Sequence, residues 1–264
     1  MLRFVITAGG TEENIDGVRK ITNFSTGTLG WLMLETLLEK MREIGRADFS
    51  VDYIHGTHAL KRELPNAIAR QVRFLPVSDA RSAYNKVFEV LKNSHIDVFI
   101  HSMAVSDFTF SYASPLANLA REIFEKTTAE GEPSLADIEG ILRNPEAKFS
   151  EGEKIASSAE IVFGLKPTEK IISQIKRLSP KTYLVGFKLL RNADETELLR
   201  AARKLEQDNA CDAILANDLS CISQERHEAV LLKRGEIIGS ATSKEAIAEM
   251  VVKHCVHQLK INEI

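Results

Sequence analysis

Apolar and polar positions follow two patterns along the chain: short apolar runs rich in β-branched residues, and longer stretches with apolar residues three or four positions apart. The short runs predict strands and the longer stretches predict helices. The expected strands are 2–7, 49–55, 69–76, 96–103, 161–165, 182–188 and 213–216, with a hairpin at 228–238 that turns at Gly235. The expected helices are 29–44, 80–91, 168–178, 195–208 and 244–259.

Residues that can cap a helix stand at the beginning of each helical stretch. The side-chain oxygens of Ser, Thr and Asp accept hydrogen bonds from the free N–H groups of a first helical turn. The expected caps are Ser25 or Thr26, Ser78 or Asp79, Thr168, Asp194 (in a capping box with Glu197) and Ser243.

Strands and helices alternate through most of the chain, which predicts an α/β fold with a doubly wound, mostly parallel, Rossmann-like sheet. In such a sheet, ligands bind at the carboxyl ends of the strands. We expect a single domain over residues 1–264, with a helical elaboration at about 113–150 and a projecting β-flap at about 151–166.

The end of the first strand carries the most informative polar residues. Gly9 and Gly10 form a turn after the apolar run, where the missing Cβ atoms let backbone N–H groups approach a ligand. A second cluster of small residues, 23–27, precedes the first helix, and a helix N-terminus attracts anions. These segments predict two phosphate-sized cradles, with Arg19 and Asn23 between them.

From the motif alone, an ordinary tight turn is an alternative, because the glycines do not form G-x-G-x-x-G and no Walker lysine follows them. The whole stretch from Thr7 to Gly27, however, resembles the nucleotide-binding start of phosphopantothenoylcysteine synthetases. Their pattern runs T-x-G-G-T-x-E-x-I-D-x-V-R-x-I-x-N-x-S-S/T-G. The chain matches nearly every fixed position, with Thr26 where many bacterial members have Ser.

Other strand ends are expected at the same edge of the sheet. Ala104 and Asp107 follow the strand at 96–103, in a segment that resembles the family's A-V-x-D-[FY]; from the residues alone, Asp107 is equally suited to capping a turn. Phe187 either stacks on a nucleobase or completes the core, and Lys188 faces phosphates or solvent. Asn217 follows the strand at 213–216.

Lys154 begins a K-I-x-S-S segment that resembles the flap of the synthetases, whose lysine reaches the nucleotide phosphates. An isolated lysine is otherwise an ordinary solvated charge. Many bacterial members read K-I-K-K at this point, and Ala156-Ser157 looks more like the eukaryotic type. The sequence therefore leaves the choice between CTP and ATP open.

The resemblance implies a ligase that joins 4′-phosphopantothenate to cysteine in coenzyme A biosynthesis, through an acyl-nucleotide formed from CTP or ATP with Mg²⁺. It implies that Asn23 contacts this intermediate, that Arg19 helps to position it, and that Lys154 neutralises phosphate charge. It also implies a homodimer, and any decarboxylase partner is expected as a separate chain because the first strand starts at residue 2. The implied nucleotide-binding residues are Gly9, Gly10, Thr11, Ser25, Thr26, Gly27, Ala104, Asp107, Phe187, Lys188 and Asn217.

Composition narrows the remaining function classes. The chain has 264 residues, a formal net charge of −3 and no stripe of basic residues, so we expect no nucleic-acid partner. Three Cys without C-x-x-C and seven His without H-E-x-x-H predict neither a disulfide framework nor a structural metal. With no signal peptide and no apolar run of about 18 residues, we expect a cytoplasmic protein without membrane contact.

Two competing functions fit the same fold. An NAD(P)- or flavin-dependent oxidoreductase is disfavoured by the missing fingerprint and by His55-Gly56, which end the second strand without an acidic residue. A nucleotide-binding module without turnover is disfavoured because Arg19, Asn23 and Lys154 occur together.

Overall fold

The computed structural model describes residues 1–129, 134–149, 160–221 and 227–259. Contacts divide the chain into two compact units: the first contains Met1–Thr11, Asn23–Val105 and Lys170–Ile264, and the second contains Glu12–Thr22 and Ser106–Glu169. The elaboration expected at about 113–150 lies in the second unit. The assignment of a single domain to the whole chain stays a prediction.

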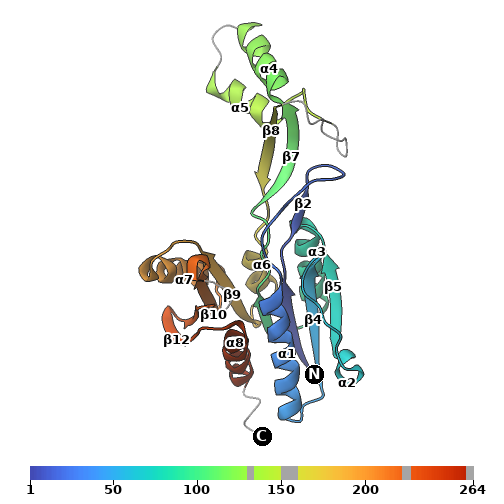
Figure 1. Ribbon diagram of the computed structural model, residues 1–264, viewed down its shortest axis with the longest axis vertical. Helices are drawn as coiled ribbons and strands as arrows, with labels where there is room; N and C mark the ends of the chain where they lie inside the picture. Colours follow the sequence, from blue (N-terminus) through green and yellow to red (C-terminus); the bar gives the residue numbers. More distant parts are fainter. Residues whose placement is uncertain (130–133, 150–159, 222–226, 260–264) are drawn as a thin grey trace. The chain divides into compact units, whose positions relative to one another are not determined.

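The first unit is built on one mixed sheet (Figure 1). Its strands are β1 (Leu2–Ala8), β4 (Phe49–Gly56), β5 (Val72–Val77), β6 (Val98–His101), β9 (Tyr183–Leu190), β10 (Ala213–Asp218), β11 (Ala229–Lys233) and β12 (Glu236–Ala241). Among the described residues, their order is β12-β11-β10-β9-β6-β1-β4-β5. All neighbours from β10 to β5 are parallel, and β11 and β12 pair antiparallel.

This order confirms the predicted doubly wound, mostly parallel sheet. The chain runs outward from β1 through β4 to β5 and then returns to β6 on the other side of β1. The winding direction therefore reverses between β1 and β6, and the carboxyl ends of these strands are where such a sheet binds ligands. The expected hairpin around Gly235 is also present, as β11 and β12.

Helices cover both faces of the sheet because successive β1 residues point to opposite sides. Phe4 and Ile6 pack in one core with residues of α1 (Thr28–Glu43) and α8 (Lys244–Gln258). Val5 packs in the other core with residues of α3 (Ala80–Asn93), α6 (Ile172–Leu178) and α7 (Glu195–Asn209). Trp31 of α1 is fully buried against the first face.

Local sequence signals placed most helix starts correctly. Asp79, Asp194 and Ser243 each accept a hydrogen bond from a backbone N–H in the first turn of α3, α7 and α8. The strand expected at 69–76 begins only at Val72, because Asn66–Ala69 form the short helix α2.

The caps expected for the helices at 29–44 and 168–178 are wrong. Gly27, in the left-handed region with φ 71°, holds the cap position of α1, so Ser25 and Thr26 lie too early to cap it. Helix α6 starts at Ile172 without a side-chain cap. The Thr168 hydroxyl donates instead to the Ser106 carbonyl at 2.5 Å.

The second unit contains short antiparallel pairs and helices. Strands β2 (Glu12–Asn14) and β3 (Lys20–Thr22) form a hairpin, and β7 (Phe108–Pro115) pairs with β8 (Ile161–Pro167). Helices α4 (Leu116–Ala129) and α5 (Leu135–Arg143) lie in the expected helical elaboration. The apolar strand expected at 161–165 is confirmed within β8, whereas residues 151–159 of the expected flap lie outside the described residues.

Candidate nucleotide site

The turn after β1 brings several segments of the first unit together. Gly9 has φ 82°, a conformation that disfavours any residue with a Cβ, and an added Cβ would lie 2.7 Å from the Ala59 Cβ. A Cβ on Gly10 would lie 2.8 Å from the Asn23 carbonyl oxygen. The missing side chains therefore let residues 23–27 approach the end of β1.

Ala104 is tied to the same turn by backbone hydrogen bonds. Its N–H donates to the Gly9 carbonyl at 2.8 Å, and its carbonyl accepts from the Thr11 N–H at 3.2 Å. The Asn23 side-chain amide donates to this same Ala104 carbonyl at 3.2 Å. The end of β1, the segment after β6 and Asn23 thus converge on one carbonyl group.

The loop from Asn23 to Gly27 continues this arrangement. The Ser25 N–H donates to the Asn23 carbonyl at 2.9 Å, and the Thr26 carbonyl accepts from the Leu60 N–H at 2.8 Å. The Thr26 hydroxyl lies 2.8 Å from the Thr28 hydroxyl at the start of α1. A Cβ on Gly27 would lie 3.1 Å from the Gly9 nitrogen, so both predicted cradles lie side by side.

Two buried polar residues that the sequence analysis did not select, Thr7 of β1 and His101 of β6, lie next to this turn. The Thr7 hydroxyl accepts from the Met103 N–H at 3.1 Å and lies 2.9 Å from His101 Nδ1. Burial lowers the pKa of His101 to about 4, so the imidazole is neutral near pH 7. Polar residues inside apolar strand runs were the available signal for this pair.

The remaining first-unit predictions lie within β9, which continues to Leu190 beyond the expected end at 188, and near the end of β10. Phe187 packs against the core shared by α1 and α8, while Lys188 stands beside Ala216 in the strand register. The Asn217 amide donates to His227 Nε2 at 3.2 Å. Burial, with Lys244 nearby, lowers the pKa of His227, a residue that the sequence analysis did not select.

Arg19 and Asp107 belong to the second unit. Asp16, whose side chain is 1% exposed, accepts from the Arg19 N–H at 2.7 Å and lies 3.8 Å from its Nε. The Asp107 carbonyl accepts from the Thr168 N–H at 3.0 Å, which joins the start of β7 to the end of β8. Lys154 lies outside the described residues.

This chemistry suits positioning and charge stabilisation of a bound anion. The turn offers backbone N–H groups, hydroxyls and one amide around adjacent glycine segments. Burial raises the pKa of both Cys211 and Cys255 to about 12, so these thiols stay protonated. Within the described ranges, no group of three or more His, Cys, Asp or Glu is placed to hold a metal ion, and no helix is long and apolar enough to cross a membrane.

Known proteins resemble the chain over most of its length. The family model "DNA/pantothenate metabolism flavoprotein C-terminal domain" matches residues 1–118 and 145–259. A "Coenzyme A biosynthesis bifunctional protein CoaBC" from Thermococcus kodakarensis is 29% identical over 232 residues. That alignment covers 88% of this chain and 45% of the relative, so the chain spans about half of that protein's length.

Solved structures agree with this match. The "DNA/Pantothenate Metabolism Flavoprotein from Streptococcus pneumoniae" is 32% identical with a TM-score of 0.75, covering 96% of this chain and 98% of that one. A mutant of Cab2 in complex with phosphopantothenate-cysteine has a TM-score of 0.65 at 16% identity, over 97% of this chain and 86% of that one, which shows a shared fold. The chain therefore belongs to the DNA/pantothenate metabolism flavoprotein C-terminal domain family.

Proposed function

We propose that this chain is a phosphopantothenate–cysteine ligase of coenzyme A biosynthesis. In its first step, a carboxylate oxygen of 4′-phosphopantothenate attacks the α-phosphorus of CTP or ATP, and pyrophosphate leaves. In its second step, the cysteine amine attacks the acyl carbon, which forms the amide and releases the nucleoside monophosphate and a proton. Family membership and the coenzyme A relatives support this proposal.

The observation that carries the proposal is the convergence of Asn23 and the turn after β1 on the Ala104 carbonyl. Backbone N–H groups beside Gly9 and Gly27 can donate hydrogen bonds to phosphate oxygens, and we assign the Asn23 amide to contact with the acyl phosphate. Both steps of the reaction need an anionic transition state held in one orientation, and fixed N–H donors provide that without a covalent intermediate on the protein.

Two cations complete the proposed chemistry. We assign Arg19 to the positioning of the acyl-nucleotide, supported by the buried Asp16 carboxylate that holds its backbone. We assign Lys154 to the neutralisation of triphosphate charge, and this assignment rests on the flap resemblance alone.

Mg²⁺ fits this reaction as an ion that enters with the nucleotide. It keeps several waters and binds mainly to substrate phosphates in many nucleotide-using sites, so it needs few protein ligands. When bound, it withdraws charge from the phosphates and eases departure of pyrophosphate. The hydroxyls and N–H groups of the turn would then hold the phosphate oxygens that the ion leaves free.

We also propose an oligomeric state, a partner activity and a cellular location. We propose a cytoplasmic homodimer that works with a decarboxylase, the second activity that accompanies this ligase in the family. Light scattering on the purified chain measures the dimer directly: a mass near twice 29.4 kDa is expected, and a monomeric mass contradicts it.

Pyrophosphate release tests the ligase proposal. The purified chain is incubated with 4′-phosphopantothenate, Mg²⁺ and either CTP or ATP, with and without cysteine. Release that requires phosphopantothenate and gives amide only with cysteine is expected, and it identifies the nucleotide. A folded protein that binds nucleotide but releases no pyrophosphate with either one would instead be a binding module.

A further inference from the structure

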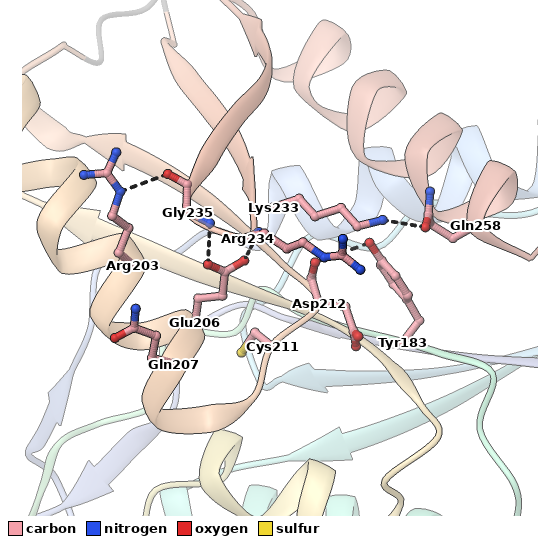
Figure 2. A pocket seen from close by; sticks show the side chains of 10 residues that line it. All are labelled: Tyr183, Arg203, Glu206, Gln207, Cys211, Asp212, Lys233, Arg234, Gly235 and Gln258. Atoms are coloured by element: carbon pink, nitrogen blue, oxygen red, sulfur yellow. Dashed lines mark hydrogen bonds between the residues drawn. The ribbon is translucent and has the colours of Figure 1, made fainter.

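The first unit has a polar cavity at the opposite end of its strands from the candidate nucleotide site. Figure 2 shows the residues that line it. Tyr183 begins β9 and Asp212 precedes β10, so the cavity lies at the amino ends of these parallel strands. Its volume is about 770 Å³. The lining residues are Tyr183, Arg203, Glu206, Gln207, Cys211, Asp212, Lys233, Arg234, Gly235 and Gln258.

Both carboxylates of the cavity are already engaged within the protein. Glu206 on α7 accepts from the backbone N–H groups of Arg234 and Gly235 at 2.6 and 2.8 Å. Asp212 lies 2.6 Å from the Lys176 ammonium and accepts from the Leu184 N–H at 2.7 Å. The lining therefore holds two carboxylates against the three cations Arg203, Lys233 and Arg234, and one of these carboxylates is already paired with Lys176.

Three cations of the cavity have no carboxylate partner in the part of the chain that the structure describes. Arg203 Nε donates to the Gly235 carbonyl at 2.9 Å, and Lys233 Nζ to Gln258 Oε1 at 2.6 Å; both acceptors are neutral. No hydrogen bond or ion pair of the Arg234 guanidinium is found among the described residues. Figure 2 shows its side chain extended between those of Lys233 and Asp212.

The backbone of Arg234 is unusual for an arginine. Its φ of 54° lies in the left-handed region, which among the described non-glycine residues is shared only with Asn192 and Ala210. Two-residue hairpin turns favour Asn, Asp or Gly at such a position, because other side chains add strain. The Glu206 carboxylate holds this turn in place, so the strained arginine is fixed beside the cavity.

We propose that this cavity binds a small molecule through its phosphate group, with Arg203, Lys233 and Arg234 as the cationic ligands. Arginine presents several N–H donors that match a phosphate, and charge-assisted hydrogen bonds are about twice as strong as neutral ones. An anion here would balance the excess of cations over carboxylates in the lining. The site is separate from the proposed nucleotide site and does not depend on the ligase function.

Inorganic phosphate is the probe for this site, titrated by calorimetry at constant ionic strength with acetate as the control anion. Arg234→Asn removes the guanidinium and places in the turn a residue that tolerates a positive φ, so the fold is expected to stay intact. Loss of a charge-assisted contact predicts phosphate affinity weaker by about tenfold or more. Arg200→Gln, an exposed change on α7 outside this cavity, is expected to leave the affinity unchanged.

Equal phosphate affinity in the wild-type and Arg234→Asn proteins would overturn the proposal, whether phosphate binds at the nucleotide site or not at all. Equal affinity for acetate and phosphate would overturn the assigned ligand class. The Arg234→Asn protein is also expected to keep the wild-type rate of pyrophosphate release at saturating substrate. The two proposals therefore fail in different measurements.

Discussion

At the scale of single residues, Asn23 is the side chain on which the proposed nucleotide site depends. Its amide donates to the Ala104 carbonyl, and its own carbonyl lies where a side chain on Gly10 would stand. An amide in this position would offer a neutral donor to the proposed anionic intermediate, which a carboxylate cannot do. We therefore expect that the charge of a residue replacing Asn23, more than its size, determines whether activity is kept.

Asn23→Asp is expected to form the acyl-nucleotide but convert it slowly to the amide, because a carboxylate repels the intermediate and loses the bond to Ala104. Rapid-quench chromatography should show the acyl-nucleotide accumulating and an amide rate lower by about tenfold or more. Asn93→Asp, an exposed change at the end of α3, is the matched control. Unchanged amide formation without accumulation would remove Asn23 from the mechanism.

Asp16 is a second residue whose replacements separate structure from function. Asp16→Asn keeps an oxygen for the Val18 and Arg19 N–H groups but removes the charge near the Arg19 guanidinium. It is expected to fold normally and lower kcat, whereas Asp16→Ala also loses about 1–3 kcal/mol of unfolding free energy. Urea titration and steady-state kinetics measure the two effects. A wild-type kcat for Asp16→Asn contradicts a role for this charge.

At the scale of elements, the sequence predicts those helix starts whose capping hydrogen bonds join residues close together in the chain. Asp79, Asp194 and Ser243 were identifiable as caps because a cap and its N–H partners lie within four residues. The Gly27 cap was missed because its conformation depends on Gly9 and Ala59, which approach it from other segments.

Elements that depend on distant partners were missed for the same reason. Strand β7 alternates aromatic and small residues from Phe108 to Tyr112, a signal that the sequence analysis did not use, and its pairing partner β8 comes after helices α4 and α5. The Thr7–His101 pair likewise joins neighbouring strands that are far apart in the chain. The glycine turn was recognised from sequence because its residues are contiguous, whereas the contact of Asn23 with Ala104 needed the fold.

The capping hydrogen bonds of Asp79 at the start of α3 predict how much stability the helix loses when the cap is removed. Its carboxylate accepts from the Ser82 N–H at 2.7 Å, and the Ser82 hydroxyl accepts from the Asp79 N–H at 3.0 Å. Asp79→Ala is expected to lower the free energy of unfolding by about 1 kcal/mol in a urea titration. The matched Ser243→Ala change on α8 should cost a similar amount. No loss in either variant would contradict the assignment of these caps.

At the scale of the whole molecule, buried histidine links stability to pH. The pKa of folded His101 is about 4, below its ordinary value of 6.5, because burial disfavours the charged ring. As the pH falls, the unfolded chain therefore takes up this proton first. The contribution of neutral His101 to the free energy of unfolding is therefore fully present above about pH 6.5, and it is lost as the pH falls toward 4.

Urea unfolding at two pH values checks this dependence. We expect the free energy of unfolding to be about 2 kcal/mol lower at pH 5 than at pH 7.5 from this residue. His101→Gln should remove most of that difference, whereas His257→Gln, exposed on α8, should preserve it. A wild-type pH dependence in the His101→Gln protein would show that other groups carry it.

The central claim is that the chain activates a carboxylate by nucleotidyl transfer, and oxygen labelling tests it most directly. 4′-Phosphopantothenate carrying ¹⁸O in its carboxylate is incubated with cysteine, Mg²⁺ and the active nucleotide, and the products are analysed by mass spectrometry. The account predicts one ¹⁸O in the released nucleoside monophosphate for each amide formed. Label in inorganic phosphate, or amide formation that leaves the monophosphate unlabelled, would contradict it.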